Sequence, residues 1–116
     1  MNTSSRVPLQ VAHNEDLWQP LVLVGDDGAA LNLTGATLKM DVRHETTDAL
    51  LLSCTVVNGR LIVTDAAAGA LEILIIAADL APIPAGTYAY DILLTANART
   101  RRLCWGPLKI GRGITQ

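Results

Sequence analysis

The chain has 116 residues, of which 50% are hydrophobic, enough to bury the core of one domain without a metal or disulfides. Its formal net charge is −2, and it contains two Trp, two Tyr and no Phe, so charge and base stacking both disfavour nucleic acid as a partner. Its longest apolar-rich stretch, residues 66–76, is interrupted by Gly69 and Glu72 and is shorter than the roughly 18 residues of a membrane-spanning helix. We expect neither nucleic acid nor membrane as a partner.

The first 14 residues are predicted to form a flexible arm or an edge strand. They are mostly polar apart from residues 7–11, where apolar residues alternate with others. Pro8 is acceptable only at a sheet edge, because it has no N–H to donate; pairing with a neighbouring molecule is the other possibility. No apolar signal core follows Met1, so we expect no export by a signal peptide.

Short runs of alternating apolar residues, each closed by turn residues, begin at residue 17. Residues 17–24 are predicted to form a strand, residues 25–28 a tight turn, and residues 30–33 an antiparallel return. Residues 36–43 follow as a half-buried strand, in which apolar side chains alternate with polar or charged ones.

Asn58-Gly59, between residues 50–57 and 61–63, is the strongest short-range hairpin signal in the chain. We therefore expect the two flanking runs to pair with each other. Residues 65–69 are small and predict a turn.

The strand predicted over residues 70–76 has apolar side chains on both faces. Its odd positions from 71 to 75 carry Leu or Ile, and its even positions carry Glu72, Leu74 and Ile76. Two apolar faces indicate burial on both sides, or a surface that awaits a partner. Together with the N-terminal run, this strand supplies the candidate interface residues Leu74, Ile76, Val7 and Leu9.

One helical turn is predicted at residues 77–80, because Pro82 and Pro84 prevent a longer helix. The strand that follows, residues 87–95, has the clearest alternation in the chain. One of its faces is formed by Tyr88, Tyr90, Ile92 and Leu94.

After a turn at residues 97–100, residues 101–110 are predicted to form the last strand, with Gly106-Pro107 marking a bulge or an edge. Residues 111–116 are predicted to be a flexible tail. The pattern of seven to nine short strands with frequent turns is typical of a two-sheet β-sandwich, here over residues 15–110.

Cys54 and Cys104 both lie inside apolar runs. This favours two free, buried thiols in a reducing compartment. A disulfide that joins two facing sheets is the alternative.

The sequence contains no recognisable catalytic or metal-binding pattern. His13 and His44 lie in separate predicted loops without the ligand spacing of a zinc or calcium site. Ser53 and Cys54 lie inside a predicted strand rather than at a nucleophile elbow, and no glycine-rich loop precedes a helix. We therefore predict no enzyme, no cofactor and no metal.

Trp18 and Trp105 admit two interpretations. Buried, they would fill the core of a protein that has few other aromatic residues, and this interpretation is preferred. Exposed, either could stack on sugar rings as in a carbohydrate-binding module. Tyr88 and Tyr90 are also interpreted as core residues.

Three segments together resemble a family of small phage and prophage structural proteins. They are LNLTGATLKMDVR at residues 31–43, NGRL at 58–61 followed by GALEI at 69–73, and AGTYAYDI at 85–92. In this order they look like the N-terminal domain of phage upper-baseplate proteins and of related short proteins encoded among tail genes. The resemblance covers roughly residues 15–110.

The resemblance implies an all-β, immunoglobulin-like antiparallel β-sandwich that acts as a building block or adaptor in a tail or baseplate, without catalysis. The expected partners are further copies of this chain and other phage structural proteins. The expected location is the host bacterial cytoplasm during assembly, and then the virion. The chain ends soon after the domain, so a small assembly subunit fits it better than an adaptor to a receptor-binding protein.

Overall fold

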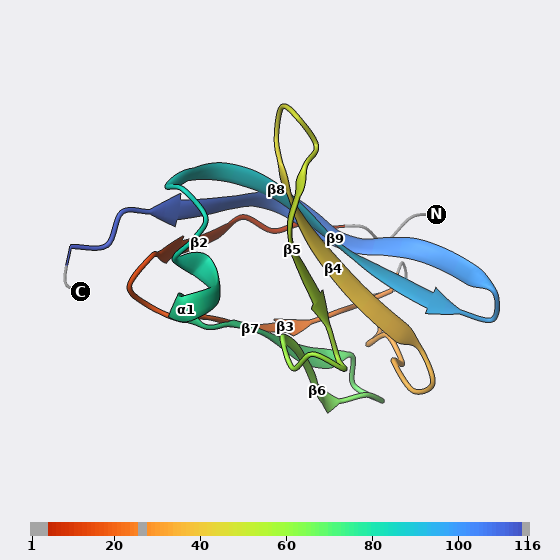
Figure 1. The fold of residues 1–116 in the computed structure, drawn as a ribbon. Coiled ribbons are helices and arrows are strands. Elements are labelled where there is room, and N and C mark those ends of the chain that lie inside the picture. The colour runs from red at the N-terminus through yellow and green to blue at the C-terminus, as the bar shows by residue number, and fades with distance from the viewer. Residues whose placement is uncertain (1–4, 26–27, 115–116) are drawn as a thin grey trace.

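A computed structural model describes residues 5–25 and 28–114, in which nine β-strands and one helical turn form two facing sheets (Figure 1). The elements are β1 (Ser5–Arg6), β2 (Leu9–Ala12), β3 (Leu17–Val22), β4 (Thr37–His44), β5 (Leu50–Thr55), β6 (Leu61–Asp65), β7 (Ala70–Ile75), α1 (Ala77–Leu80), β8 (Gly86–Ala96) and β9 (Arg99–Gly111).

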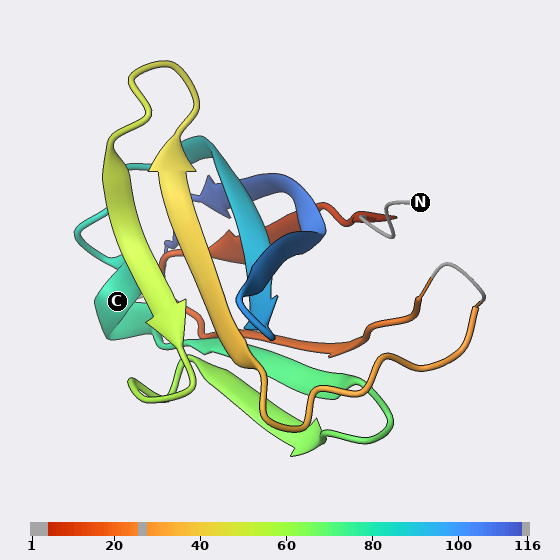
Figure 2. The same cartoon turned by 90° about the vertical axis from the view of Figure 1, so that its right-hand side faces the viewer.

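The two sheets have the strand order of an immunoglobulin-like sandwich. The larger sheet runs β1-β9-β8-β4-β5, with β2 also paired to β9, and the smaller sheet runs β3-β7-β6. Strands β1 and β2 are parallel to β9, and every other pair is antiparallel. Figure 2 shows the smaller sheet beneath the larger one. The predicted all-β, immunoglobulin-like fold is confirmed.

A tyrosine corner supports the same assignment. The hydroxyl of Tyr88 donates a hydrogen bond to the carbonyl of Pro84, four residues earlier, just after the strand β8 begins. Tyr90, two residues later, lies where antibody domains carry the second cysteine of their inter-sheet disulfide. Both tyrosines are buried, as predicted.

The core lies between the sheets and follows the period-two pattern of the sequence. In β8 the predicted apolar face is buried, and β4 and β7 also bury alternate residues. The predicted helical turn is α1, whose Leu80 is fully buried.

The prediction that Asn58-Gly59 forms a hairpin is wrong. Strand β5 pairs with β4 and β6 pairs with β7, so this segment crosses from the larger sheet to the smaller one. The Asn58 side chain accepts hydrogen bonds from the backbone N–H groups of Thr55 and Arg60, at 2.9 and 3.1 Å. Burial of Cys54 and Leu61 on facing sheets outweighs the local hairpin preference.

The predicted return strand at residues 30–33 is not formed. The pairing with residues 17–24 is limited to an isolated bridge between Val24 and Ala30 and a hydrogen bond from the Leu31 N–H to the Leu23 carbonyl. Asp26 and Asp27, in the predicted turn, lie outside the described residues.

Gly106-Pro107 marks neither a bulge nor an edge strand, because both residues pair with β8 in register and β9 lies between β8 and the N-terminal strands. The register of β9 shifts at Leu103 instead, between the pairs Ile92–Cys104 and Leu93–Arg102. Gly106 lies beside Val7, which joins β1 to β2, and a Cβ at this position would come within 2.6 Å of the Val7 carbonyl oxygen. The glycine is therefore required for close packing of the N-terminal segment against β9.

The N-terminal segment before residue 15 and the C-terminal segment after residue 110 differ in structure. Residues 5–6 and 9–12 are strands at the edge of the larger sheet. The last strand extends to Gly111, and residues 112–114 have no regular structure.

Candidate interaction surfaces

The four predicted interface residues do not form one surface. Leu74 is half-buried on the outer face of the smaller sheet, and Ile76 is 47% exposed just after β7. Val7 is half-buried and packs against the core. Leu9 is only 4% exposed, because it points between the sheets, so it does not contribute to a surface of this chain.

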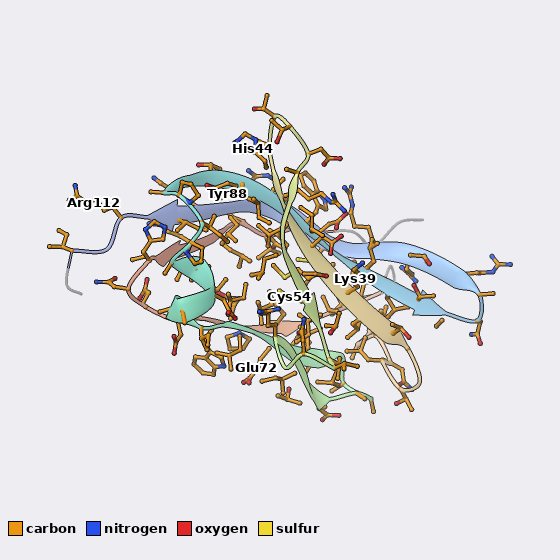
Figure 3. All side chains as sticks on the ribbon, viewed as in Figure 1. Lys39, His44, Cys54, Glu72, Tyr88 and Arg112 are labelled. Atoms are coloured by element: carbon orange, nitrogen blue, oxygen red, sulfur yellow. The ribbon has the colours of Figure 1, made fainter. Side chains whose placement is uncertain are left out.

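The outer face of the smaller sheet carries the largest exposed aromatic side chain. Trp18 is 59% exposed and lies directly opposite Leu74 on the neighbouring strand. The prediction that Trp18 fills the core is wrong, because the β3 parity that buries Leu17 turns Trp18 outward. We call Trp18, Val22, Ile62 and Leu74 the outer apolar face; Glu72 lies among them and points away from the larger sheet (Figure 3).

Trp105 is also not a core residue. It is half-buried on the opposite side of the sandwich, in the wall of an open groove of about 540 Å³ on the outer face of the larger sheet. The Arg102 guanidinium lies 5.0 Å from the centre of the Trp105 ring, a cation–π distance.

One row of polar side chains crosses the floor of this groove. Asp91 pairs across β-strands with Asp41 on one side and with Trp105 on the other, and Trp105 pairs with Arg6. Asp41 accepts hydrogen bonds from the Ser53 hydroxyl at 3.0 Å and from Arg43 at 3.2 Å, while Lys39 lies 3.9 Å away. The groove therefore combines an indole ring with carboxylates and guanidinium groups. The sequence did not predict this groove, because the local alternation of side chains does not say which strands lie on either side of β8.

The two thiols are inaccessible and far apart. Cys54 and Cys104 are free and buried on strands separated by β8 and β4, which places them three strand spacings apart, about 14 Å. A disulfide needs Cα atoms within about 7 Å, so the alternative of a bridge across facing sheets is wrong. Burial raises the pKa of Cys54 to about 12, and it also raises the pKa of Cys104, so neither thiol is an activated nucleophile.

The histidines have structural contacts in separate regions. The His13 ring bonds to the carbonyl of Ile83, and the His44 Nδ1 accepts a hydrogen bond from the Thr46 N–H at 3.1 Å. Across the described residues, no group of three or more His, Cys, Asp or Glu side chains is placed to hold a metal ion. Within the same residues, no helix is long and apolar enough to cross a membrane.

Comparison with known proteins identifies the fold. No family model and no curated protein matches the chain. The N-terminal domain of phage TP901-1 ORF48 matches with a TM-score of 0.58 at 12% identity, covering 93% of this chain and 98% of that one. The first immunoglobulin domain of mouse SynCAM 2 matches with a TM-score of 0.45 at 11% identity, over 92% and 93% of the two chains.

The match to the phage domain spans nearly all of both chains. It confirms, at the level of the fold, the resemblance to phage proteins that the sequence motifs indicate. The class defined here is therefore an immunoglobulin-like β-sandwich of the kind found in a phage protein.

Proposed function

We propose that this chain is a non-catalytic structural or assembly protein of a phage or prophage, a building block of a tail or baseplate. The observation that supports this most strongly is the end-to-end match to the fold of a phage domain. The motifs at residues 31–43 and 85–92 point to the same family. The expected locations are the host bacterial cytoplasm during assembly and then the virion.

The outer apolar face supports a role in docking. Trp18 and Val22 are 59% and 67% exposed on the same face as Leu74. Burying such side chains against a partner is favourable by about 25 cal/mol for each Å² of apolar surface. We therefore place the contact with further copies of this chain, or with other phage structural proteins, on the smaller sheet.

Particles from the encoding phage, or from the induced prophage, test the proposal. We expect the chain in tail fractions at a fixed ratio to the major tail protein, measured by quantitative mass spectrometry. If it is absent from particles and from assembly intermediates, the proposal is wrong.

Two aspartate variants test the surface. Leu74→Asp should reduce incorporation without unfolding the chain, because Leu74 is only half-buried. Thr87→Asp adds the same charge to an exposed position of the larger sheet and serves as the control. Loss of incorporation in both variants would argue against the smaller sheet as the contact surface.

Carbohydrate binding in the groove is the second candidate function, and the position of Trp105 beside Asp91 supports it. Trp18 and Trp105 lie on opposite outer faces, so one sugar chain could not stack on both. Titration with oligosaccharides from the host cell wall should change Trp fluorescence. The response should disappear in Trp105→Ala and persist in Trp18→Ala; no response in the unsubstituted protein would exclude this candidate.

A further inference from the structure

A single carboxylate lies in the middle of the outer apolar face. Glu72 is on β7, the central strand of the smaller sheet, and pairs with Pro20 on β3 and with Ile62 on β6. Along β7, its neighbours on the same side of the sheet are Ala70 and Leu74. Apolar side chains therefore flank Glu72 along its own strand and on both adjoining strands.

The apolar surroundings of Glu72 are exposed on β3. Trp18 and Val22 lie two residues before and two residues after Pro20, on the same side of the sheet, and are 59% and 67% exposed. Glu72 itself is half-buried among these neighbours, on the side of the smaller sheet that points away from the larger one (Figure 3). An exposed apolar surface of this kind is typical of a site that binds another macromolecule.

Glu72 has no counter-ion in the described part of the chain. Within residues 5–25 and 28–114, its side chain forms no hydrogen bond and no ion pair. The strands β3, β6 and β7 carry two charged residues, Glu72 and Asp65, and both are acidic. Arg60, just before β6, is already bound to Asp79 at 3.0 Å and to the Ser53 carbonyl at 3.1 Å. None of the three strands therefore supplies a cation to Glu72.

This unpaired carboxylate restricts what can cover the face. Burial of an ionised group in an apolar interface is strongly unfavourable unless an opposite charge is buried with it. A purely apolar partner is disfavoured for this reason. Two copies that met through the same face about a two-fold axis would bring one Glu72 close to the other, and like charges that face each other across an interface repel. The same face of a second copy is therefore disfavoured as well.

We propose that the outer apolar face binds a different phage structural protein, through a surface of that protein that has one arginine or lysine among apolar side chains. The inference rests on the proposed function and deepens it, because it chooses between the partners considered there and names the chemistry of the contact. A guanidinium group suits Glu72 best, since it can donate two hydrogen bonds to one carboxylate. The surrounding apolar contacts exclude water and so strengthen this ion pair.

Charge reversal at residue 72 tests this chemistry with the chain itself as the probe. Glu72→Lys keeps the apolar surroundings and has a cation at the centre, so its outer face reproduces the surface that we propose for the partner. A mixture of wild-type protein and Glu72→Lys should form a heterodimer, and its association constant should exceed that of either protein with itself by roughly tenfold or more. Sedimentation velocity at tens of micromolar, with labelled wild-type protein, measures the three constants.

Two controls separate this contact from a general attraction between opposite charges. Thr87→Lys adds a positive charge at an exposed position of the larger sheet, and it should not associate with the wild-type protein. Trp18→Ala in the wild-type partner should weaken the heterodimer roughly tenfold, because the apolar contacts around the ion pair contribute to binding. Circular dichroism verifies folding, and Glu72→Arg provides a second variant of the same charge. No heterodimer with either variant of residue 72, or equal association with Thr87→Lys, would overturn the proposal.

Incorporation into phage particles tests the contact with the native partner. Glu72→Gln removes the charge and Glu72→Lys reverses it, so incorporation should decrease in that order, whereas Thr87→Lys should be incorporated normally. Quantitative mass spectrometry of the particles measures the three ratios. Self-association of the wild-type protein that Leu74→Asp abolishes would show that the outer apolar face binds a second copy, and this result would also overturn the proposal.

The outcomes separate this inference from the proposed function. Normal incorporation of Glu72→Lys, in a chain that is present in particles, overturns the inference and leaves the phage role intact. A heterodimer that depends on residue 72 and on Trp18, in a chain absent from particles and from assembly intermediates, supports the requirement of this face for a cation and contradicts the phage role.

Discussion

The hydroxyl of Tyr90 donates a hydrogen bond to the backbone carbonyl of Val7, which lies 83 positions earlier in the chain. Tyr90 is on β8, and the strand between it and Val7 is β9. The cross-strand neighbour of Tyr90 on β9 is Gly106, whose lack of a side chain leaves room for the contact. The bond therefore ties the N-terminal segment to the interior of the larger sheet.

Tyr90→Phe should lower the free energy of unfolding by about 1–2 kcal/mol, because it leaves the Val7 carbonyl without this donor. Urea unfolding followed by Trp fluorescence measures the change. Hydrogen exchange should also become faster in β2, next to Val7, and stay unchanged in β6. Unchanged stability would show that the Val7 carbonyl finds another partner.

Gly106→Ala should destabilise the protein by roughly 1–3 kcal/mol, because the new methyl group would lie 2.6 Å from the Val7 carbonyl oxygen. Gly111→Ala is the matched control on the same strand: its nearest contact would be ordinary, at 3.9 Å from the Val11 carbonyl oxygen. Thermal unfolding of both variants tests the difference. Equal effects would argue against a close approach at Val7.

Cys54 should make stability fall in alkaline solution. Burial raises the pKa of its thiol from 9.0 to about 12, so between these values the folded chain keeps a proton that the unfolded chain has lost. The stabilising contribution is complete below pH 9 and is lost as the pH rises towards about 12. Urea unfolding across this range should show the decline, and Cys54→Ala should make it less steep. An unchanged slope in the variant would contradict this assignment.

Ala98→Gly should raise the free energy of unfolding by roughly 0.5–1 kcal/mol, since Ala98 has φ +61° in the turn between β8 and β9. Asn97, with φ +53°, precedes it, and Asn-Gly is the preferred pair for such a turn. Ala89→Gly, inside β8, is the control and should lower stability. A loss of stability in Ala98→Gly would show that the turn does not strain the alanine.

The amino-acid sequence by itself determined most of the segments that become strands and which of their faces are buried; the predicted strand at residues 30–33 is the exception. Alternation in β4 and β8 depends only on neighbouring residues, because successive side chains of a strand point to opposite faces. The helical turn before Pro82 follows from the same kind of local chemistry. The class of fold could be predicted for this reason.

Only the tertiary structure decided how the strands pair. The strand pairing in turn determines where the candidate surfaces lie. Asn58-Gly59 has the local preference of a hairpin, yet it connects two sheets, because the burial of β5 and β6 against opposite layers involves residues distant in the sequence. Composition predicts core positions for Trp18 and Trp105, but strand parity and the neighbouring strands turn both side chains outward.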